Sequence, residues 1–126
     1  MPGATILVVD DDPVIQQLLR VSFEMEGYEV ITANDGVDGL ERARADRPAL
    51  MILDVMMPRM NGHEVARALK ADPGTSSIPI LMLSAKAQTA DVSVGAASGV
   101  DDYVTKPFDP QLLLERAEDL IRRSDG

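Results

Sequence analysis

The sequence contains no cysteine and no tryptophan, few aromatic residues and little positive charge. Without cysteine, the fold cannot depend on disulfide bonds or thiolate metal sites, so we expect a reducing compartment, the cytoplasm. Aromatic residues make up 3% of the chain, too few for a platform that stacks single-stranded nucleic acid. The 12 Lys and Arg residues stand against 21 Asp and Glu residues, for a formal net charge of -9. This charge repels the phosphates of DNA, so we expect no direct nucleic-acid binding and favour a divalent cation as ligand.

Long apolar runs are also missing. The first run, Ile6 to Val9, is ended by three consecutive aspartates, so it suits neither a signal peptide nor a membrane span, and no membrane partner is expected. With 126 residues, 45% of them hydrophobic, the chain has the size of one domain that buries a core without covalent staples. We therefore expect residues 1–126 to form a single domain.

Short apolar runs alternate with amphipathic stretches along the chain, which is typical of βα units that build a parallel sheet. Several runs are continuously apolar, which indicates strands buried on both faces. The pattern predicts an α/β fold with strands over Thr5–Val9, Glu29–Ala33, Ala49–Leu53, Ile78–Leu83 and Asp101–Val104.

A helix is predicted after each strand, and capping signals support several of these helices. The first helix follows Asp12 and Pro13, an N-cap and a proline at the first helical position, and ends at Gly27. Its inner stripe is predicted to be Val14, Leu18, Val21 and Met25. The second helix is predicted over about residues 37–45, the third from 61–62 to before 72, and the fourth over about 88–98. The fifth begins at Pro110 after an Asp109 cap. The residues expected to face inward are Val65 and Leu69 in the third helix and Leu113, Ala117, Leu120 and Ile121 in the fifth. The helix over 88–98 is the weakest, because valines and Gly95 are poor residues for a helix interior.

Reactive side chains stand at the ends of four predicted strands. Aspartates 10–12 follow the first strand, and Asp54, Ser84 and Lys106 mark the ends of the third, fourth and fifth. Because the carboxyl ends of parallel strands meet at one edge of the sheet, we expect these groups to converge. Converging carboxylates repel one another unless a hard cation such as Mg²⁺ joins them. The Asp54 carboxylate can then attack a phosphoryl group while Lys106 and Ser84 neutralise its oxygens, so these three are the predicted catalytic residues.

Four segments carry a family resemblance, and they occur in order and with matching spacing: Leu7-Val-Val-Asp-Asp-Asp-Pro, Leu53-Asp-Val-Met-Met-Pro-Arg-Met-Asn-Gly, Leu83-Ser-Ala and Asp101-Asp-Tyr-Val-Thr-Lys-Pro-Phe. Together they resemble the receiver domain of bacterial two-component response regulators, over essentially the whole chain. The resemblance implies a flavodoxin-like (βα)5 doubly wound sheet with strand order 2-1-3-4-5. It also implies a phosphorelay protein that catalyses only its own phosphorylation and dephosphorylation, not an enzyme acting on other molecules.

The resemblance assigns roles to individual residues. Asp54 is the implied phosphoacceptor. The implied Mg²⁺ site consists of Asp11, Asp54, the backbone carbonyl of Met56 and Asp10, with Asp11 a direct ligand and Asp10 an acidic neighbour that usually holds the metal through water. Ser84 and Tyr103 are the implied switch, in which the tyrosine turns inward as the serine moves toward the phosphoryl group. Pro107 resembles the family's cis-proline, which would fix the loop that carries Lys106.

The resemblance further implies partners. A sensor histidine kinase or a histidine phosphotransfer protein would donate the phosphoryl group, and a downstream effector or a fused output domain would receive the signal. The signal is expected to leave through the fourth helix, fifth strand and fifth helix, at Val92, Asp102, Leu112 and Arg116. Asp102 and Arg116 match positions of charge pairs in receivers that dimerise, whereas Val92 and Leu112 replace an opposed Lys and Glu. Both a phosphorylation-dependent homodimer and a heterologous partner therefore stay open.

Two other functions are compatible with parts of the sequence. Asp10-Asp11-Asp12 contains the Asp-x-Asp pattern of phosphohydrolases of the haloacid dehalogenase type, with Asp10 as nucleophile and Asp12 as acid/base. That scheme gives Asp54 and Lys106 no role, and the chain has no room for a substrate cap. The second alternative is a receiver-like module that binds proteins without being phosphorylated.

Two residue types have simpler interpretations. The single histidine, His63, is expected to be exposed in the first turn of a helix. Met56, Met57 and Met60 are expected to pack against the protein rather than to bind a soft metal.

Overall fold

The computed structural model describes residues 3–57, 59–85 and 100–125. Five parallel strands form one sheet in the order β2-β1-β3-β4-β5, which confirms the expected α/β class and strand order. The fourth helix expected over 88–98 lies outside the described residues. In chain order the elements are β1 (Thr5–Val9), α1 (Pro13–Glu24), β2 (Glu29–Ala33), α2 (Gly36–Asp46), β3 (Leu50–Asp54), α3 (Gly62–Ala71), β4 (Ile80–Ala85), β5 (Asp102–Lys106) and α5 (Pro110–Asp125).

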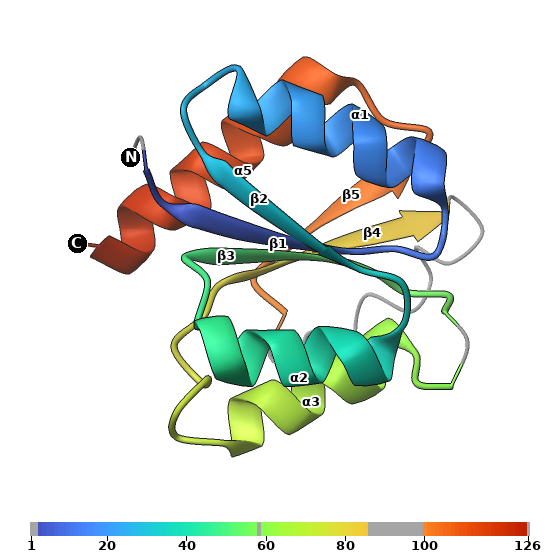
Figure 1. The fold of residues 1–126 in the computed structure, drawn as a ribbon, viewed down its shortest axis with the longest axis vertical. Coiled ribbons are helices and arrows are strands. Elements are labelled where there is room, and N and C mark those ends of the chain that lie inside the picture. The colour runs from blue at the N-terminus through green and yellow to red at the C-terminus, as the bar shows by residue number, and fades with distance from the viewer. Residues whose placement is uncertain (1–2, 58, 86–99, 126) are drawn as a thin grey trace.

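Helices cover both faces of the sheet, with α1 and α5 on one side and α2 and α3 on the other (Figure 1). Alternate residues of β1 therefore enter two different hydrophobic clusters. Ile6 and Val8 pack in the cluster that includes α1 and α5, whereas Leu7 and Val9 pack in the one that includes α2 and α3. All four have no exposed surface, which explains why this strand is continuously apolar in sequence.

The last three strands extend further toward their carboxyl ends than the sequence predicts. The ladder pairs Asp54 with Leu83, and it continues through Ser84 with Thr105 to Ala85 with Lys106. The polar side chains assigned to strand ends thus belong to the strands themselves. Local sequence cannot show this, because a neighbouring strand supplies the hydrogen bonds that prolong each strand.

Helix α1 turns a different face to the core from the predicted one. The predicted inner stripe is exposed, with exposed fractions of 71% for Val14, 39% for Leu18, 45% for Val21 and 78% for Met25. Leu19 and Phe23 are buried instead, and Ile15 packs against the same cluster. Phe23 meets the ring of Tyr28 edge to face, with 5.9 Å between centroids. Both stripes have helical spacing, so only packing against the sheet and α5 decides which one is buried.

The helix caps and the inner face of α5 agree with the sequence. Asp12 accepts a hydrogen bond from the Val14 amide at the start of α1, and Asp109 accepts one from the Gln111 amide at the start of α5. The predicted inward residues of α3 and α5 are all buried, namely Val65, Leu69, Leu113, Ala117, Leu120 and Ile121.

The prediction for His63 is wrong, because this side chain is buried, with 9% of its surface exposed. The first turn of α3 presses against the end of β3: a Cβ atom on Gly62 would lie 2.5 Å from the Asp54 carbonyl oxygen. Such close contact covers a helix start that sequence alone suggests is open to solvent.

Among the described residues, no helix is long and apolar enough to cross a membrane.

Candidate functional site

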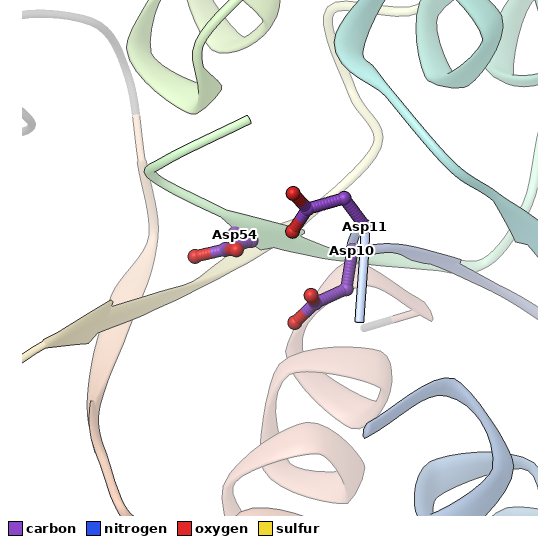
Figure 2. Close-up of side chains that lie close together, drawn as sticks. All are labelled: Asp10, Asp11 and Asp54. Carbon is purple, nitrogen blue, oxygen red and sulfur yellow. The ribbon is translucent and has the colours of Figure 1, made fainter. Parts of the chain in front are cut away.

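Three carboxylates meet where β1 and β3 end. Asp10, Asp11 and Asp54 each offer an oxygen, and these oxygens all lie within 4.8 Å of one another. Figure 2 shows the three side chains converging, two from the β1–α1 connection and one from the end of β3. Asp10 has no exposed surface and Asp54 only 6%, whereas Asp11 is exposed. The cluster is therefore buried on one side and open to solvent on the other.

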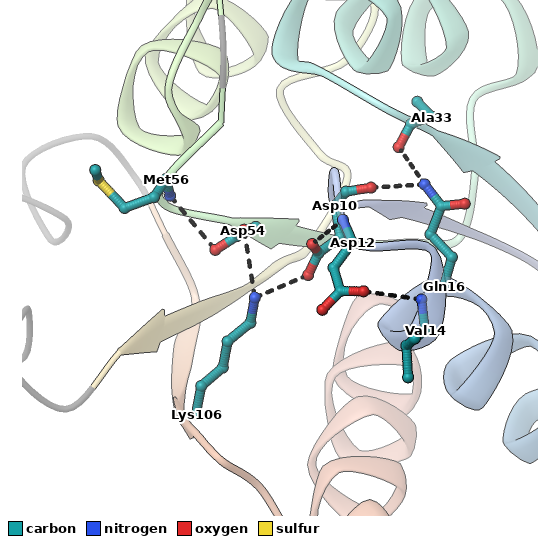
Figure 3. A network of polar contacts seen from close by, with 8 residues as sticks. All are labelled: Asp10, Asp12, Val14, Gln16, Ala33, Asp54, Met56 and Lys106. Atoms are coloured by element: carbon teal, nitrogen blue, oxygen red, sulfur yellow. Dashed lines mark hydrogen bonds and ion pairs between the residues drawn. The ribbon is translucent and has the colours of Figure 1, made fainter.

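Lys106 lies between the two buried carboxylates (Figure 3). Its Nζ atom is 3.0 Å from Oδ2 of Asp10 and 3.3 Å from Oδ2 of Asp54. Backbone amides hold the other oxygen of each carboxylate: the Asp12 amide donates to Asp10 at 2.9 Å and the Met56 amide donates to Asp54 at 3.4 Å. Hydrogen bonds and one ammonium group thus fix the orientation of both carboxylates.

The electrostatics of the cluster follow from burial and from like charges held close together. Burial, and secondarily the charge of Asp10, raise the pKa of Asp54 to about 6, although Lys106 and the Met56 amide favour the ionised form. Burial alone disfavours the Lys106 ammonium, but its hydrogen bond to Asp10 and the attraction of both carboxylates outweigh this and raise its pKa. Lysine therefore stays charged, and the excess charge of the cluster is negative.

This donor set fits a hard divalent cation. Carboxylate oxygens are the ligands that Mg²⁺ prefers. Burial, and secondarily the charge of Asp10, raise the pKa of Asp54 and so disfavour its ionised form, which a bound cation would favour. The exposed side chain of Asp11 leaves the cluster accessible from solvent, and Mg²⁺ commonly retains several waters.

The other residues assigned to the site lie near it with different exposure. Ser84 is buried with 1% of its surface exposed, on the strand adjacent to Asp54, and the backbone of Met56 contacts Asp54 while its side chain is 63% exposed. Tyr103 on β5 is half-buried and packs against the cluster on the α2 and α3 side. The Lys106–Pro107 peptide bond is cis, as the resemblance implies.

The expected partner surface is described in part. Asp102 and Arg116 pair within the chain, with Nη1 of the arginine 3.0 and 3.1 Å from the two carboxylate oxygens. Together with Leu112 and Tyr103, Arg116 lines an open pocket of about 300 Å³. Val92 lies outside the described residues. Two residues at positions of charge pairs in dimerising receivers thus pair with each other inside this chain.

The sequence predicts two alternative roles for Asp12, helix N-cap or acid/base, and none for Gln16. The Asp12 carboxylate caps α1 and is not one of the three carboxylates that converge in the cluster. The Gln16 side-chain amide donates to the carbonyl oxygens of Asp10 and Ala33, at 2.6 and 3.2 Å (Figure 3). No local signal identifies Gln16, because one acceptor lies on β2, far along the chain.

Comparisons with known proteins agree with this geometry. The family model for the response regulator receiver domain matches residues 6–118. The DNA-binding response regulator MtrA of Mycolicibacterium smegmatis is 46% identical over 120 residues, which is 95% of this chain and 51% of that protein. The transcriptional regulator RpaA of Synechocystis is 45% identical over 120 residues, 95% of this chain and 50% of that protein. The chain spans about half the length of the curated relatives it matches.

Solved structures are similar over most of the chain. The chemotaxis response regulator CheY4 of Vibrio cholerae has a TM-score of 0.88 and 35% identity, with 94% of this chain and 98% of that chain covered. The receiver domain of a sensor histidine kinase from Pseudomonas aeruginosa has a TM-score of 0.87 and 28% identity, with 95% and 98% covered. That structure has a magnesium ion coordinated in its active site cleft.

Proposed function

The chain belongs to the family of response regulator receiver domains of two-component signalling, and we propose that Asp54 is the residue that accepts the phosphoryl group. The observation that carries this proposal is the convergence of Asp10, Asp11 and Asp54, with Lys106 bonded to both buried carboxylates. Of the two buried carboxylates, Asp54 is the one with some exposed surface, so a phosphoryl donor can approach it.

Asp54 acts as the nucleophile. One of its oxygens forms a bond to phosphorus, the bond between phosphorus and the donor breaks, and the electron pair of that bond leaves with the donor. With a pKa of about 6, Asp54 is mostly ionised at neutral pH and carries the charge that the attack needs. Sensor histidine kinases and histidine phosphotransfer proteins are the proposed natural donors.

The surrounding residues hold and neutralise the transferred group. Lys106 already reaches Oδ2 of Asp54, so its ammonium lies where an oxygen of a phosphoryl group on Asp54 can accept a hydrogen bond. Ser84, on the adjacent strand, is proposed to hold a second oxygen and to begin the switch with Tyr103. Asp10, Asp11, Asp54 and the Met56 carbonyl are the proposed Mg²⁺ ligands. When bound, Mg²⁺ supplies positive charge that offsets the repulsion between attacking carboxylate and phosphoryl oxygens.

The exposed stripe of α1 is the surface that we propose for the phosphoryl donor. This helix starts beside the site, and Leu18 contributes with Ile15 and Phe108 to an open, largely apolar pocket of about 420 Å³ that Lys106 also lines. Apolar surface next to the nucleophile suits a protein donor, whereas a small donor needs only the carboxylate cluster. Leu18→Asp should therefore slow transfer from a phosphorylated histidine phosphotransfer protein and leave transfer from acetyl phosphate unchanged.

Phosphorylation is proposed to act on β5 and α5, near Asp102, Leu112 and Arg116, with the region of Val92. Residues 1–126 are proposed to act as one domain in the cytoplasm. Because the curated relatives are DNA-binding regulators about twice as long, a fused output domain or a separate effector is the proposed receiver of the signal.

Intact-mass measurement after incubation with acetyl phosphate tests the function. The wild-type chain should gain one phosphoryl group when Mg²⁺ is present and none after chelation. Asp54→Asn should gain none, and Asp119→Asn, a change at a partly exposed carboxylate on α5 that pairs with Arg123, should behave as wild type. Equal labelling of Asp54→Asn and wild type would refute the assignment.

A further inference from the structure

The turn between β2 and α2, formed by Asn34 and Asp35, carries none of the proposed metal ligands but contacts both segments that do. On one side it meets Gln16 of α1. The Gln16 amide nitrogen donates to Oδ1 of Asn34 at 2.8 Å and to the backbone carbonyl of Asp10 at 2.6 Å. One side chain therefore joins the turn to the segment that holds Asp10.

On the other side the turn meets the loop between β3 and α3. This loop is closed at its base, where the Gly62 amide donates to the Val55 carbonyl at 2.9 Å. Arg59 stands near its tip with a left-handed backbone, φ of 68°. Its guanidinium forms a two-bonded fork with the Asp35 carboxylate: Nε donates a hydrogen bond to Oδ2 at 3.2 Å, and Nη2 donates one to Oδ1 at 3.1 Å. A left-handed backbone is uncommon for a residue other than glycine.

Backbone packing reinforces the same contact. A Cβ atom on Gly36, next to Asp35, would lie 2.1 Å from the Met60 carbonyl oxygen, so the loop and the start of α2 touch with no side chain between them. Asp35 also caps α2 through a 2.9 Å bond from the Asp38 amide, which fixes the carboxylate to a rigid helix. The fork thus connects Arg59, in the loop between β3 and α3, to the start of helix α2.

We propose that Asp35 and Arg59, with Asn34 and Gln16 opposite, form a brace that sets the spacing between the two segments holding Mg²⁺. The inference rests on the proposed function, since Met56 is assigned as a ligand within the braced loop. Mg²⁺ demands near-ideal octahedral geometry, so a loop held in place before binding loses less freedom when the ion binds. Asp35 and Arg59 are positioning residues that act through this loop.

A purely long-range effect of charge on Mg²⁺ affinity predicts the opposite result for Arg59 from the one that the brace predicts, so the two can be told apart. Removing the positive charge of Arg59 near an acidic site should strengthen Mg²⁺ binding if only charge matters, and removing the negative charge of Asp35 should weaken it. Loss of the brace weakens binding in both cases. Arg59 is 59% exposed, so breaking the pair should change global stability little.

The experiment measures the Mg²⁺ dissociation constant by calorimetry on metal-free protein, and urea unfolding in parallel. The variants are Arg59→Met, Asp35→Asn, which keeps an oxygen to cap α2, and the double variant. Arg44→Met is the matched control, because it breaks a similarly exposed pair with Asp72 that lies outside the brace. We expect each brace variant to weaken Mg²⁺ binding by about threefold to tenfold, at or below the loss of about tenfold or more seen when a group bonded directly to a metal ligand is removed, because Asp35 and Arg59 act through the loop.

The double variant should be no weaker than the singles, since all remove the same contact, and Arg59→Lys should recover part of the affinity. Unchanged or tighter binding by Arg59→Met overturns the brace, and so does equal weakening by Arg44→Met. A failed brace leaves Mg²⁺ binding by wild type intact and dependent on Asp54. If wild type binds no Mg²⁺, or Asp54→Asn binds it equally well, the proposed function itself fails.

Discussion

The ammonium group of Lys106 lies 3.0 Å from Oδ2 of Asp10, a carboxylate with no exposed surface. The lysine comes from the end of β5 and the aspartate from the residue after β1, two strands that β3 and β4 separate in the sheet. The contact forms because the lysine side chain reaches across the carboxyl edge that all the strands share. A buried carboxylate needs a cation or several hydrogen bonds to stay ionised. In the metal-free protein, Lys106 therefore serves stability as well as the chemistry at Asp54.

Replacing Lys106 with methionine should destabilise the metal-free protein. The change leaves the carboxylates of Asp10 and Asp54 facing each other without the cation between them. Removing one partner of a fully buried pair costs about 3–5 kcal/mol, and the partial exposure of this lysine should reduce the loss to roughly 1–3 kcal/mol. Urea unfolding measures it. Lys106→Arg, which keeps the charge, should lose less, and equal stability of Lys106→Met and wild type would contradict this role.

Asp54→Asn should be more stable than wild type at neutral pH without Mg²⁺. The pKa of Asp54 is raised to about 6 in the folded protein, so the fold favours the protonated form. The stability from this group is fully present below the unfolded pKa of about 4 and is lost as pH rises through 6. At pH 8 the free energy of unfolding of Asp54→Asn should exceed that of wild type by about 1–3 kcal/mol, and this difference should disappear near pH 4. A constant gap across this range would mean that titration of Asp54 is not the cause.

Millimolar Mg²⁺ should raise the melting temperature of the wild-type chain. An ion that binds only the folded state stabilises it by about 2.7 kcal/mol at a concentration 100 times its dissociation constant. Asp11→Ala should lose most of this gain while folding normally, because the side chain is exposed. Asp46→Ala, on α2, is the control for loss of an exposed carboxylate elsewhere. A melting temperature that does not change when Mg²⁺ is added would argue against a cation in the cluster.

Neighbouring leucines on α1 should respond very differently to truncation. Leu19 is 1% exposed and Leu18 is 39% exposed. Leu19→Ala leaves a cavity and should cost about 2–5 kcal/mol, whereas Leu18→Ala should cost less than about 1 kcal/mol. Urea denaturation of the two variants decides between the observed and the predicted inner stripe. A larger loss for Leu18→Ala would restore the stripe predicted from sequence.

Leu112→Glu should weaken association of the phosphorylated chain without slowing phosphoryl uptake. Leu112 is 43% exposed beside the paired Asp102 and Arg116, so it can enter an interface without breaking the fold. Sedimentation velocity with acetyl phosphate and Mg²⁺ measures the association. Ala45→Glu, at an exposed residue on α2 outside both proposed interaction surfaces, is the control. If both variants associate as wild type does, the interface lies on another surface.

The sequence by itself determined the sheet class and the chemistry of its edge. Apolar runs, caps such as Asp12 and Asp109, and the polar residues closing each strand are local signals, because each depends on the few residues around it. The parallel order of the strands then requires the polar ends to share one edge, so the grouping of Asp10, Asp54 and Lys106 followed without coordinates.

Tertiary structure alone decided which surfaces became interior and which side chains support the site. Helix α1 has two apolar stripes, and only contact with the sheet and α5 buries Leu19 rather than Leu18. His63 is covered because α3 starts against the end of β3. The fork between Arg59 and Asp35 spans separate βα units, so neither residue carries a local signal for the other. Such contacts form between segments distant in sequence, and they depend on how the folded elements pack, which periodicity and capping do not encode.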